Sequence, residues 1–220
     1  MKETHIFDVD HTLLRTSTAY CFVKECVKRG LIKLHLLIQV PYYLYKYRQA
    51  KLDNKILNRD IPFLRGLKRE VLFEMGRKSF EKYAKKEIFL EALELISELK
   101  QAQKRVIIAT SSFDFLILPV ADFLGIENII CSSMEYKNGV CTGNTKGSAV
   151  FGSTKKEKAL SFLADRNISP FDCIFYSDSY YDLPLFQEIG KKVAINPDRK
   201  LKNHAIANGW EIKYYKKTNI

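Results

Sequence analysis

Two patterns of hydrophobic and polar positions alternate along most of this 220-residue chain. Short continuous apolar runs are typical of strands that are buried on both faces of a sheet. They predict strands at 4–9, 105–110, 129–130, 172–177 and 192–195. Apolar residues three and four positions apart predict amphipathic helices at 91–100, 113–124, 155–166 and 183–189. An Asn-Gly pair within 135–140 predicts a β-hairpin.

Strands that alternate with helices are typical of the α/β class, in which right-handed crossovers place helices over a parallel sheet. We therefore expect a Rossmann-like, mostly parallel sheet with helices on both faces. The segment 16–87 interrupts this order after the first strand, because its pattern is helical and it contains few glycines and prolines. We expect residues 1–15 and 88–220 to form the α/β core, and residues 16–87 to form a separate helical cap.

The excess positive charge of the chain lies in this predicted cap. Segment 16–87 holds 17 Lys and Arg residues against 7 Asp and Glu, a net charge of +10, whereas the whole chain carries +11. A basic segment attracts anionic partners. Four tyrosines add aromatic surface to it: Tyr42, Tyr43, Tyr45 and Tyr47. This segment is either an ordinary solvated helical face or a surface for a lipid headgroup or a bulky anionic substrate.

The cysteines and the apolar windows bear on where the protein works. The chain has 5 Cys residues, without a Cys-x-x-Cys pair or zinc-ligand spacing, so we expect reduced thiols and a cytoplasmic location. The first residues show no apolar signal region. The most apolar window, 31–47, is interrupted by Lys33, Pro41 and Lys46. We therefore expect no transmembrane segment.

Two acidic residues follow the first predicted strand. Asp8 and Asp10 are two positions apart, and residues i and i+2 of a strand point to the same side. Neighbouring carboxylates repel each other unless a cation or a shared proton relieves the repulsion. Mg²⁺ prefers oxygen ligands of this kind. The pair is therefore either half of a Mg²⁺ site or two scattered acids of a surface turn.

Later parts of the chain supply the rest of a site. The predicted strand at 105–110 ends in Thr110, Ser111 and Ser112, and the strand at 172–177 leads into a stretch that contains Asp178 and Asp182. In open α/β sheets, ligands bind at the carboxyl ends of the strands. Between the two stretches, a pair of lysines begins the predicted helix at 155–166. We expect these polar groups to meet at one edge of the sheet.

With these elements in order, the chain resembles the haloacid dehalogenase superfamily of phosphohydrolases. The stretch 8–12, DVDHT, resembles its first motif and Thr110 its second. Lys156 resembles its third motif, and Asp178 with Asp182 its fourth. The sequence YSDSYYDLPLF is similar to the subfamily that contains phosphoserine phosphatase. The resemblance implies a Mg²⁺-dependent phosphoric monoester hydrolase that acts through an aspartyl-phosphate, with a cap over the active site.

The resemblance also implies roles for the acidic residues. Asp8 is expected to be the nucleophile and a metal ligand. Asp10 is expected to act as general acid and base, and to give its backbone carbonyl to the metal. Asp178 is expected to be a direct Mg²⁺ ligand and Asp182 a water-mediated one.

The remaining motif residues are expected to bind the phosphoryl group. Thr110 and Ser111 would donate hydrogen bonds to it, and Thr12 would hold the turn on the substrate-binding side. Lys156 would neutralise the phosphoryl group and the nucleophile. Lys155 is the alternative for this role, because the two lysines are adjacent.

Three positions depart from the pattern of phosphoserine phosphatases. Ser17 stands where they carry a Glu for the substrate ammonium, Asp60 stands where an Arg grips the substrate carboxylate, and Tyr181 replaces an Asn. We therefore expect the substrate to be another small phosphorylated metabolite or a lipid-headgroup monoester.

Two other functions stay open from the sequence. One is a phosphotransferase that passes the phosphoryl group to an acceptor other than water. The other is a binding module with vestigial chemistry, whose basic cap docks on nucleic acid or on an anionic membrane surface. A decayed site would have lost an acid or the lysine, and none is lost here. This favours the enzyme and makes nucleic acid a poor candidate, whereas peripheral membrane contact stays open.

Overall fold

The computed structural model describes residues 3–32 and 61–216. The strands are β1 (Thr4–Phe7), β2 (Arg105–Phe113), β3 (Asn128–Ser132), β4 (Met134–Lys137), β5 (Val140–Thr145), β6 (Cys173–Ser177), β7 (Lys191–Ile195) and β8 (Glu211–Lys213). The α-helices are α1 (Thr18–Lys28), α4 (Arg69–Ser79), α5 (Leu90–Gln101), α6 (Asp114–Leu124), α7 (Ser153–Ala164), α8 (Leu183–Glu188) and α9 (Arg199–Ala207). Short 3-10 turns lie at Pro62–Leu64, Lys85–Glu87, Pro170–Asp172 and Tyr180–Asp182, and a π-helical turn lies at Phe80–Ala84.

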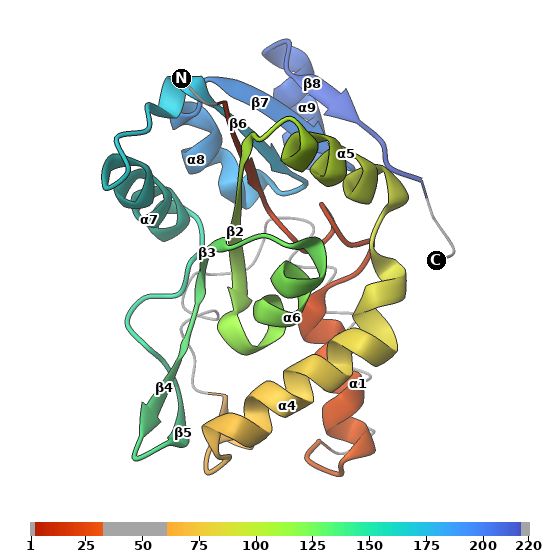
Figure 1. Cartoon of the computed structure of the whole chain (residues 1–220), viewed down its shortest axis with the longest axis vertical. Helices are drawn as coiled ribbons and strands as arrows, with labels where there is room; N and C mark the ends of the chain where they lie inside the picture. Colours follow the sequence, from red (N-terminus) through yellow and green to blue (C-terminus); the bar gives the residue numbers. More distant parts are fainter. Residues whose placement is uncertain (1–2, 33–60, 217–220) are drawn as a thin grey trace.

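A six-stranded parallel sheet forms the centre of the molecule (Figure 1). Its strand order is β3-β2-β1-β6-β7-β8, and each neighbouring pair is parallel. β1 is therefore a central strand, with β2 on one side and β6 on the other. The expected α/β fold, with its mostly parallel sheet, is confirmed.

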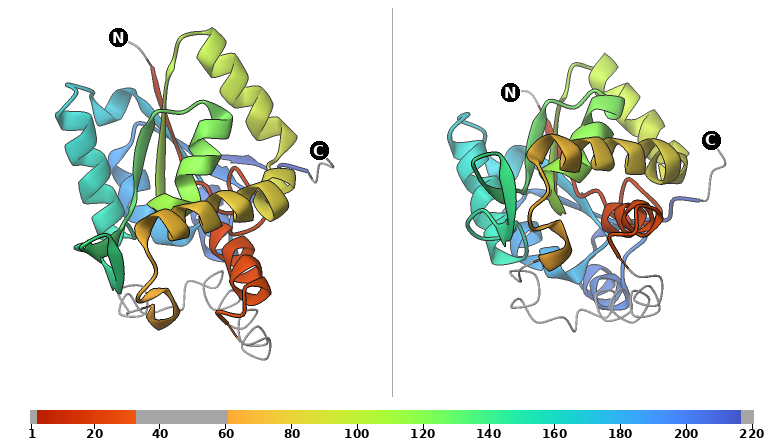
Figure 2. Two further views of the ribbon diagram at one scale, coloured as in Figure 1. Left: turned by 60° about the horizontal axis from the view of Figure 1, so that its bottom comes forward. Right: turned by 90° about the horizontal axis from the view of Figure 1, so that it is seen from below.

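Helices cover both faces of this sheet, as expected. On one face, α5 and α6 pack against side chains that include Phe7, Ile108 and Tyr176. On the other face, α7, α8 and α9 pack against side chains that include Ile107 and Phe175. Figure 2 shows α5 and α6 on one side of the sheet and α7 on the other. Side chains alternate between the two faces along each strand, which explains why continuous apolar runs form these strands.

The described parts of the segment 16–87 lie across one end of the sheet. In Figures 1 and 2, α1 and α4 lie at the end toward which β1 and β2 run. They share a core with the start of α6 and with the antiparallel hairpin of β4 and β5, and this core includes Phe22, Met75, Phe115 and Cys141. The segment therefore has its own buried contacts near the carboxyl ends of the strands. Its division from the core at residues 15/16 and 87/88 stays a prediction.

Helices α4 and α6 approach each other closely at a glycine. A Cβ atom placed on Gly76 would lie only 1.9 Å from the backbone oxygen of Phe115. This oxygen is available because Pro119, four residues later in α6, has no N–H to donate to it. The proline thus leaves a carbonyl that faces the glycine of the neighbouring helix.

The two points where the chain leaves and re-enters the core are joined. Arg15 N donates to Glu87 O at 2.8 Å, and Phe89 N donates to Leu13 O at 3.0 Å. The side chains join as well, because Arg15 Nε lies 2.7 Å from Glu87 Oε2. The segment between them thus begins and ends at one place in the fold.

Two C-terminal elements had no clear sequence pattern. α9 buries only Leu201 and Ala205, so its apolar positions are too sparse to show a helical period. β8 is a three-residue edge strand in which only Ile212 is partly buried. The hydrophobic pattern therefore predicts neither α9 nor β8.

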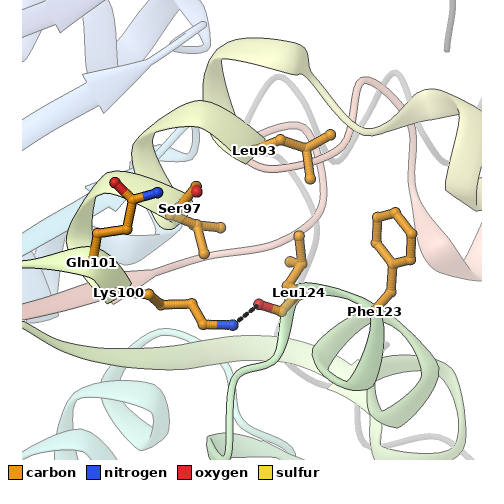
Figure 3. A pocket seen from close by; sticks show the side chains of 7 residues that line it. Leu93, Ser97, Lys100, Gln101, Phe123 and Leu124 are labelled. Carbon is orange, nitrogen blue, oxygen red and sulfur yellow. Dashed lines mark hydrogen bonds between the residues drawn. The ribbon is translucent and has the colours of Figure 1, made fainter. Parts of the chain in front are cut away.

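The C-terminal end of α6 borders a pocket of about 370 Å³ between α5 and α6. Figure 3 shows Lys100 pointing across it, with its Nζ donating to Leu124 O at 3.1 Å. Gly125 ends α6 in the left-handed conformation, at φ 63°. None of the expected site residues lines this pocket, whose walls include Leu93, Ser97 and Phe123.

Candidate active site

Asp8 and Asp178 follow two neighbouring central strands at the same edge of the sheet. Phe7 pairs with Tyr176, and Asp8 N donates to Tyr176 O at 2.9 Å. The two acids are 5% and 4% exposed, respectively. Buried carboxylates need partners or a cation. The parallel register thus brings together two acids that lie far apart in the sequence.

A buried lysine pairs with the first of these acids. Lys155 Nζ lies 2.9 Å from Asp8 Oδ1, and it lies 2.7 and 2.8 Å from the two oxygens of Asp182. Lys155 is 2% exposed and stands in the first turn of α7, after Gly152. One ammonium group therefore holds two carboxylates from different elements.

The structure places Lys155 in the site, and not Lys156 as expected. Lys156 Nζ lies 3.7 Å from Glu188, and its side chain is 32% exposed. The buried face of α7 consists of Lys155, Ala159 and Leu163, which are spaced four residues apart. Lys156 therefore lies one position away from the buried face of α7, and the alternative, Lys155, lies on it.

Burial and charge shift the titration of this pair. Burial raises the pKa of Asp8 to about 7; Lys155 opposes this shift, and the carboxylates of Asp182 and Asp10 add to it. For Lys155, burial favours the neutral amine, but Asp182 and Asp8 together raise its pKa above the ordinary value. The lysine therefore stays charged, and its one ammonium group is shared by the carboxyl groups of Asp8 and Asp182.

Asp182, the expected water-mediated metal ligand, contacts the lysine and a serine in the structure. Both of its oxygens contact Lys155, and Ser177 Oγ donates to its Oδ2 at 2.6 Å. Through these contacts, Asp182 fixes the position of the Lys155 ammonium group. The residues Tyr180–Asp182 form a 3-10 turn, and the contact with Lys155 joins the end of this turn to α7.

The carboxylate of Asp10 accepts three hydrogen bonds. Thr18 N donates to Oδ1 at 2.8 Å, and the hydroxyls of Ser17 and Ser112 donate to Oδ2 at 3.2 and 3.0 Å. Thr110 is fully buried beside them, and its Oγ1 accepts from Ser112 N at 3.3 Å. Ser112 thus contacts both Asp10 and Thr110, which are two of the expected site residues.

Sequence reasoning gave Ser112 no role. β2 continues to Phe113, three residues beyond the predicted end of the strand, so Ser112 lies two positions along the same strand from Thr110. Period-two spacing of hydroxyl residues was the signal that could have found it. Ser111 is only partly buried, and its backbone oxygen accepts from Ser132 Oγ at 2.9 Å.

The turn after β1 explains the place of Thr12. His11 adopts φ 62°, and Thr12 N donates to Val9 O at 3.2 Å. Thr12 is fully buried, and its hydroxyl has no hydrogen-bond partner among the described residues. This placement fits the expected role in the turn, but it does not offer Thr12 to a substrate.

Asp198 stabilises the loop after β6 through hydrogen bonds. Asp198 N donates to Asp178 O at 2.8 Å, and Asp198 Oδ2 accepts from Tyr180 N at 2.7 Å. Its other oxygen accepts from Leu201 N at 2.8 Å and caps α9. Asp198 therefore caps α9 and is also linked to Asp178.

The donors near Asp8 suit one class of metal. Across residues 3–32 and 61–216, no three His, Cys, Asp or Glu side chains gather as a metal-binding cluster. Two buried carboxylates and nearby backbone carbonyls are oxygen donors, and Mg²⁺ binds through one or two carboxylates while it keeps several waters. A divalent cation would also favour the ionised form of Asp8, whose pKa is raised first by burial and then by the carboxylates of Asp182 and Asp10. The residues present therefore fit Mg²⁺ better than a structural zinc.

Some expected features fall outside the described residues. Asp60 and the four tyrosines of the basic segment, Tyr42, Tyr43, Tyr45 and Tyr47, belong to this group. Of the other departures, Ser17 contacts Asp10, and Tyr181 packs on Phe151 with ring centroids 4.6 Å apart. Within the described ranges, no helix has the length and apolar character needed to cross a membrane.

Curated relatives match nearly the whole chain. It is 30% identical over 222 residues to a histidinol-phosphatase of Neisseria meningitidis serogroup C (strain 8013), covering 98% of this chain and 100% of the relative. It is 28% identical over 220 residues to phosphoserine phosphatase SerB1 of Mycobacterium tuberculosis (strain ATCC 25618 / H37Rv), covering 96% and 70%. The expected kinship to this group of proteins is confirmed.

Solved structures share the fold. A protein of unknown function from Bordetella pertussis Tohama I has a TM-score of 0.82 at 22% identity, covering 96% of this chain and 98% of that one. A substrate-bound phosphoserine phosphatase complex has a TM-score of 0.74 at 21% identity, covering 99% and 94%. A family model for haloacid dehalogenase-like hydrolase matches residues 6–187. The chain therefore belongs to the haloacid dehalogenase-like hydrolase family.

Proposed function

We propose that this protein is a Mg²⁺-dependent phosphomonoester hydrolase with Asp8 as its nucleophile. The observation that carries the proposal is the contact of Lys155 with Asp8, at 2.9 Å in a buried site beside Asp178. A carboxylate attacks a phosphoryl group well only where its charge and the phosphate charge are compensated. Relatives named as phosphatases support the same reaction class.

The reaction proceeds in two steps. In the first, a carboxylate oxygen of Asp8 forms a bond to phosphorus as the bond to the leaving oxygen breaks. Asp10 gives its proton to that oxygen, and the alcohol departs. In the second, Asp10 takes a proton from water, the water oxygen attacks phosphorus, and the bond to Asp8 breaks. Inorganic phosphate leaves, and Asp8 and Asp10 return to their starting states.

Asp8, Asp178 and the backbone carbonyl of Asp10 would hold Mg²⁺ in this site. The bound cation would supply charge neutralisation, so that an anionic carboxylate can approach an anionic phosphate. Lys155 replaces Lys156 in the proposed phosphoryl-binding role. Thr110 and Ser111, near the carboxyl end of β2, are the proposed hydrogen-bond donors to the phosphoryl group.

The proposed substrate is a small phosphorylated metabolite other than phosphoserine. Ser17 stands at the position of the ammonium-binding acid in phosphoserine phosphatases, and its hydroxyl already donates to Asp10. A neutral side chain engaged in this way offers no charge to an amine. Losing a hydrogen bond to a charged group costs about 1.5–3 kcal/mol. The name of one relative, histidinol-phosphatase, adds an amino-alcohol phosphate to the substrates worth testing.

The basic segment 16–87 supports a substrate with further negative charge or a lipid headgroup. Its net charge of +10 also leaves peripheral contact with an anionic membrane surface as a related proposal. Transfer of the phosphoryl group to an acceptor other than water is the alternative reaction for the same residues.

A substrate panel with Mg²⁺ tests the proposal. Phosphate release is measured for phosphoserine, histidinol phosphate, sugar phosphates, nucleotides, phosphocholine and lysophosphatidate, at two salt concentrations. Asp8→Asn serves as the inactive control, since it keeps the size of the side chain but not the nucleophile. We expect at least one substrate to exceed phosphoserine by ~10²-fold in kcat/KM, the equivalent of two lost charged contacts. Near-wild-type turnover by Asp8→Asn on any substrate contradicts the mechanism, and phosphoserine as the best substrate contradicts the specificity.

A further inference from the structure

Asp10 is held by donors from two different parts of the fold. Ser112, which donates to Oδ2 at 3.0 Å, belongs to β2 of the core. Ser17 and Thr18, which donate at 3.2 and 2.8 Å, stand at the start of α1. Both oxygens of the carboxylate are engaged. The orientation of Asp10 therefore depends on the core and on the first turn of α1 together.

A hydrogen bond between two hydroxyls joins these parts. Thr18 Oγ1 lies 2.8 Å from Ser112 Oγ, and either group can donate. While Ser112 donates its one hydrogen to Asp10, it accepts from Thr18. When the proton is on Asp10, both hydroxyls can rotate so that Asp10 donates to Ser112 and Ser112 donates to Thr18. The pair thus supports the carboxylate and the carboxylic acid with the same arrangement of heavy atoms.

The hydroxyl groups of Thr18 and Ser112 are shielded from bulk water, so water does not readily take the place of either one. Thr18 is 3% exposed and Ser112 is 7% exposed. If one hydroxyl is removed, its partner has no ready substitute, and a buried polar group without a partner is unfavourable. Asp10 would then rotate toward its remaining donors, Ser17 and the backbone of Thr18.

We infer that Ser112 is a positioning residue for Asp10, and that Thr18 makes this positioning depend on the place of α1. The inference rests on the proposed function, in which Asp10 gives a proton to the leaving oxygen. A misplaced Asp10 should slow the departure of strongly basic leaving groups most. A leaving group that departs without a proton should be affected little.

The test compares three monoesters of similar size: p-nitrophenyl, phenyl and benzyl phosphate. The basicity of the leaving oxygen rises along this series, whereas the ring stays the same. The full-length variants are Ser112→Ala, the pair Thr18→Val and Thr18→Ser, and Asp10→Asn as the reference for complete loss of the acid. Ser161→Ala removes an exposed hydroxyl from α7 and serves as the control. The measured quantity is kcat/KM, which covers formation of the phosphorylated Asp8.

We expect Ser112→Ala to lower kcat/KM for benzyl phosphate at least ~10-fold and that for p-nitrophenyl phosphate less than ~3-fold, as partial loss of general acid catalysis predicts. Thr18→Val should show the same gradient more weakly, and Thr18→Ser should restore the wild-type series. Ser161→Ala should match the wild type. If Ser112→Ala does not fold, the contrast between the two Thr18 variants decides the question.

Two results distinguish a failure of the role inferred for Ser112 and Thr18 from a failure of the role proposed for Asp10. The inference is overturned if Ser112→Ala loses the same factor in kcat/KM for all three esters, or if the two Thr18 variants lose the same factors as each other. This holds provided that the loss in Asp10→Asn still grows with the basicity of the leaving group. A flat series for Asp10→Asn itself overturns the role of Asp10 in the proposed function.

Discussion

Lys155 Nζ contacts Asp8 Oδ1 at 2.9 Å, although the two residues are 147 positions apart in the chain. The same nitrogen contacts Asp182, so a single buried ammonium joins β1, α7 and the turn after β6. A charge in such a place is stable only while its partners remain. The lysine is therefore part of the structure of the site as well as of its proposed chemistry.

Replacing Lys155 by Met should abolish most activity and weaken the fold. The variant leaves Asp8 and Asp182 buried without their cation, and breaking a buried ion pair costs about 3–5 kcal/mol. We expect kcat to fall at least ~10²-fold, as for the loss of one electrostatic stabiliser. Urea unfolding and phosphate release measure the two effects.

Lys156→Met is the matched control for this lysine. Its side chain is partly exposed and lies 3.7 Å from Glu188, so its removal should change stability by less than ~0.5 kcal/mol. Equal losses of activity in the two variants would contradict the assignment to Lys155.

Removing divalent cations should stop turnover. The proposed donors Asp8 and Asp178 are both buried, and their charge calls for a cation. We expect no phosphate release in excess chelator and full recovery on addition of Mg²⁺. Thermal unfolding should also shift upward with Mg²⁺ in the wild type, and less so in Asp178→Asn. Undiminished turnover in chelator would remove Mg²⁺ from the proposal.

Gly76→Ala should loosen the contact of α4 with α6. The added methyl would meet the Phe115 carbonyl at 1.9 Å, so one of the helices must move. Overpacking of this kind costs about 1–3 kcal/mol, from which the better helix propensity of Ala recovers up to ~1 kcal/mol. Chemical denaturation should therefore show a net loss of stability.

Arg77→Ala, at the next and exposed position of α4, controls for substitution in this helix. It should stay within ~0.5 kcal/mol of the wild type. A Gly76→Ala variant as stable as Arg77→Ala would mean that the close approach is easily relieved.

The contribution of His5 to the stability of the fold should decrease as the pH falls below neutrality. Burial lowers the pKa of His5, whose Nδ1 lies 3.0 Å from the Tyr176 hydroxyl. In the unfolded chain this histidine takes up a proton near pH ~6.5, whereas in the folded chain it does so at lower pH. Between these values the unfolded state binds more protons at His5, so the contribution of His5 to stability is full above pH ~6.5 and declines below it.

The measurement is the free energy of unfolding at pH 7.5 and pH 5.5. The difference between the two values should be smaller in His5→Leu than in the wild type, even if the variant is less stable throughout. His204→Gln removes a histidine elsewhere in the chain and serves as the comparison. An unchanged difference in His5→Leu would assign the pH dependence to other groups.

The sheet and most helices of the core were predictable, because buried parallel strands and amphipathic helices leave strong patterns. The meeting of Asp8 with Asp178 also followed from topology, since both residues come after strands that share an edge. The patterns could not predict the rotation of a helix about its axis to within one residue. Lys155 and Lys156 differ by one position, and Lys155 is the one that shares the buried face of α7 with Ala159 and Leu163.

The contact of Ser112 with Asp10 was hidden for another reason. It depends on three more residues of β2 and on a shift of register between Ala109 and Phe113. Local propensity does not determine where a strand stops. The same holds for α9, whose place follows from two buried residues and from the cap by Asp198.

The meeting of Arg15 and Glu87 has a consequence for how this fold tolerates change. Because backbone and side-chain bonds hold these residues together, everything between them is thermodynamically a closed loop. The entropy of closing a loop grows only with the logarithm of its length, by about 0.6 kcal/mol for each doubling. The core can therefore carry an intervening segment of very different length at a nearly constant entropic cost of closure.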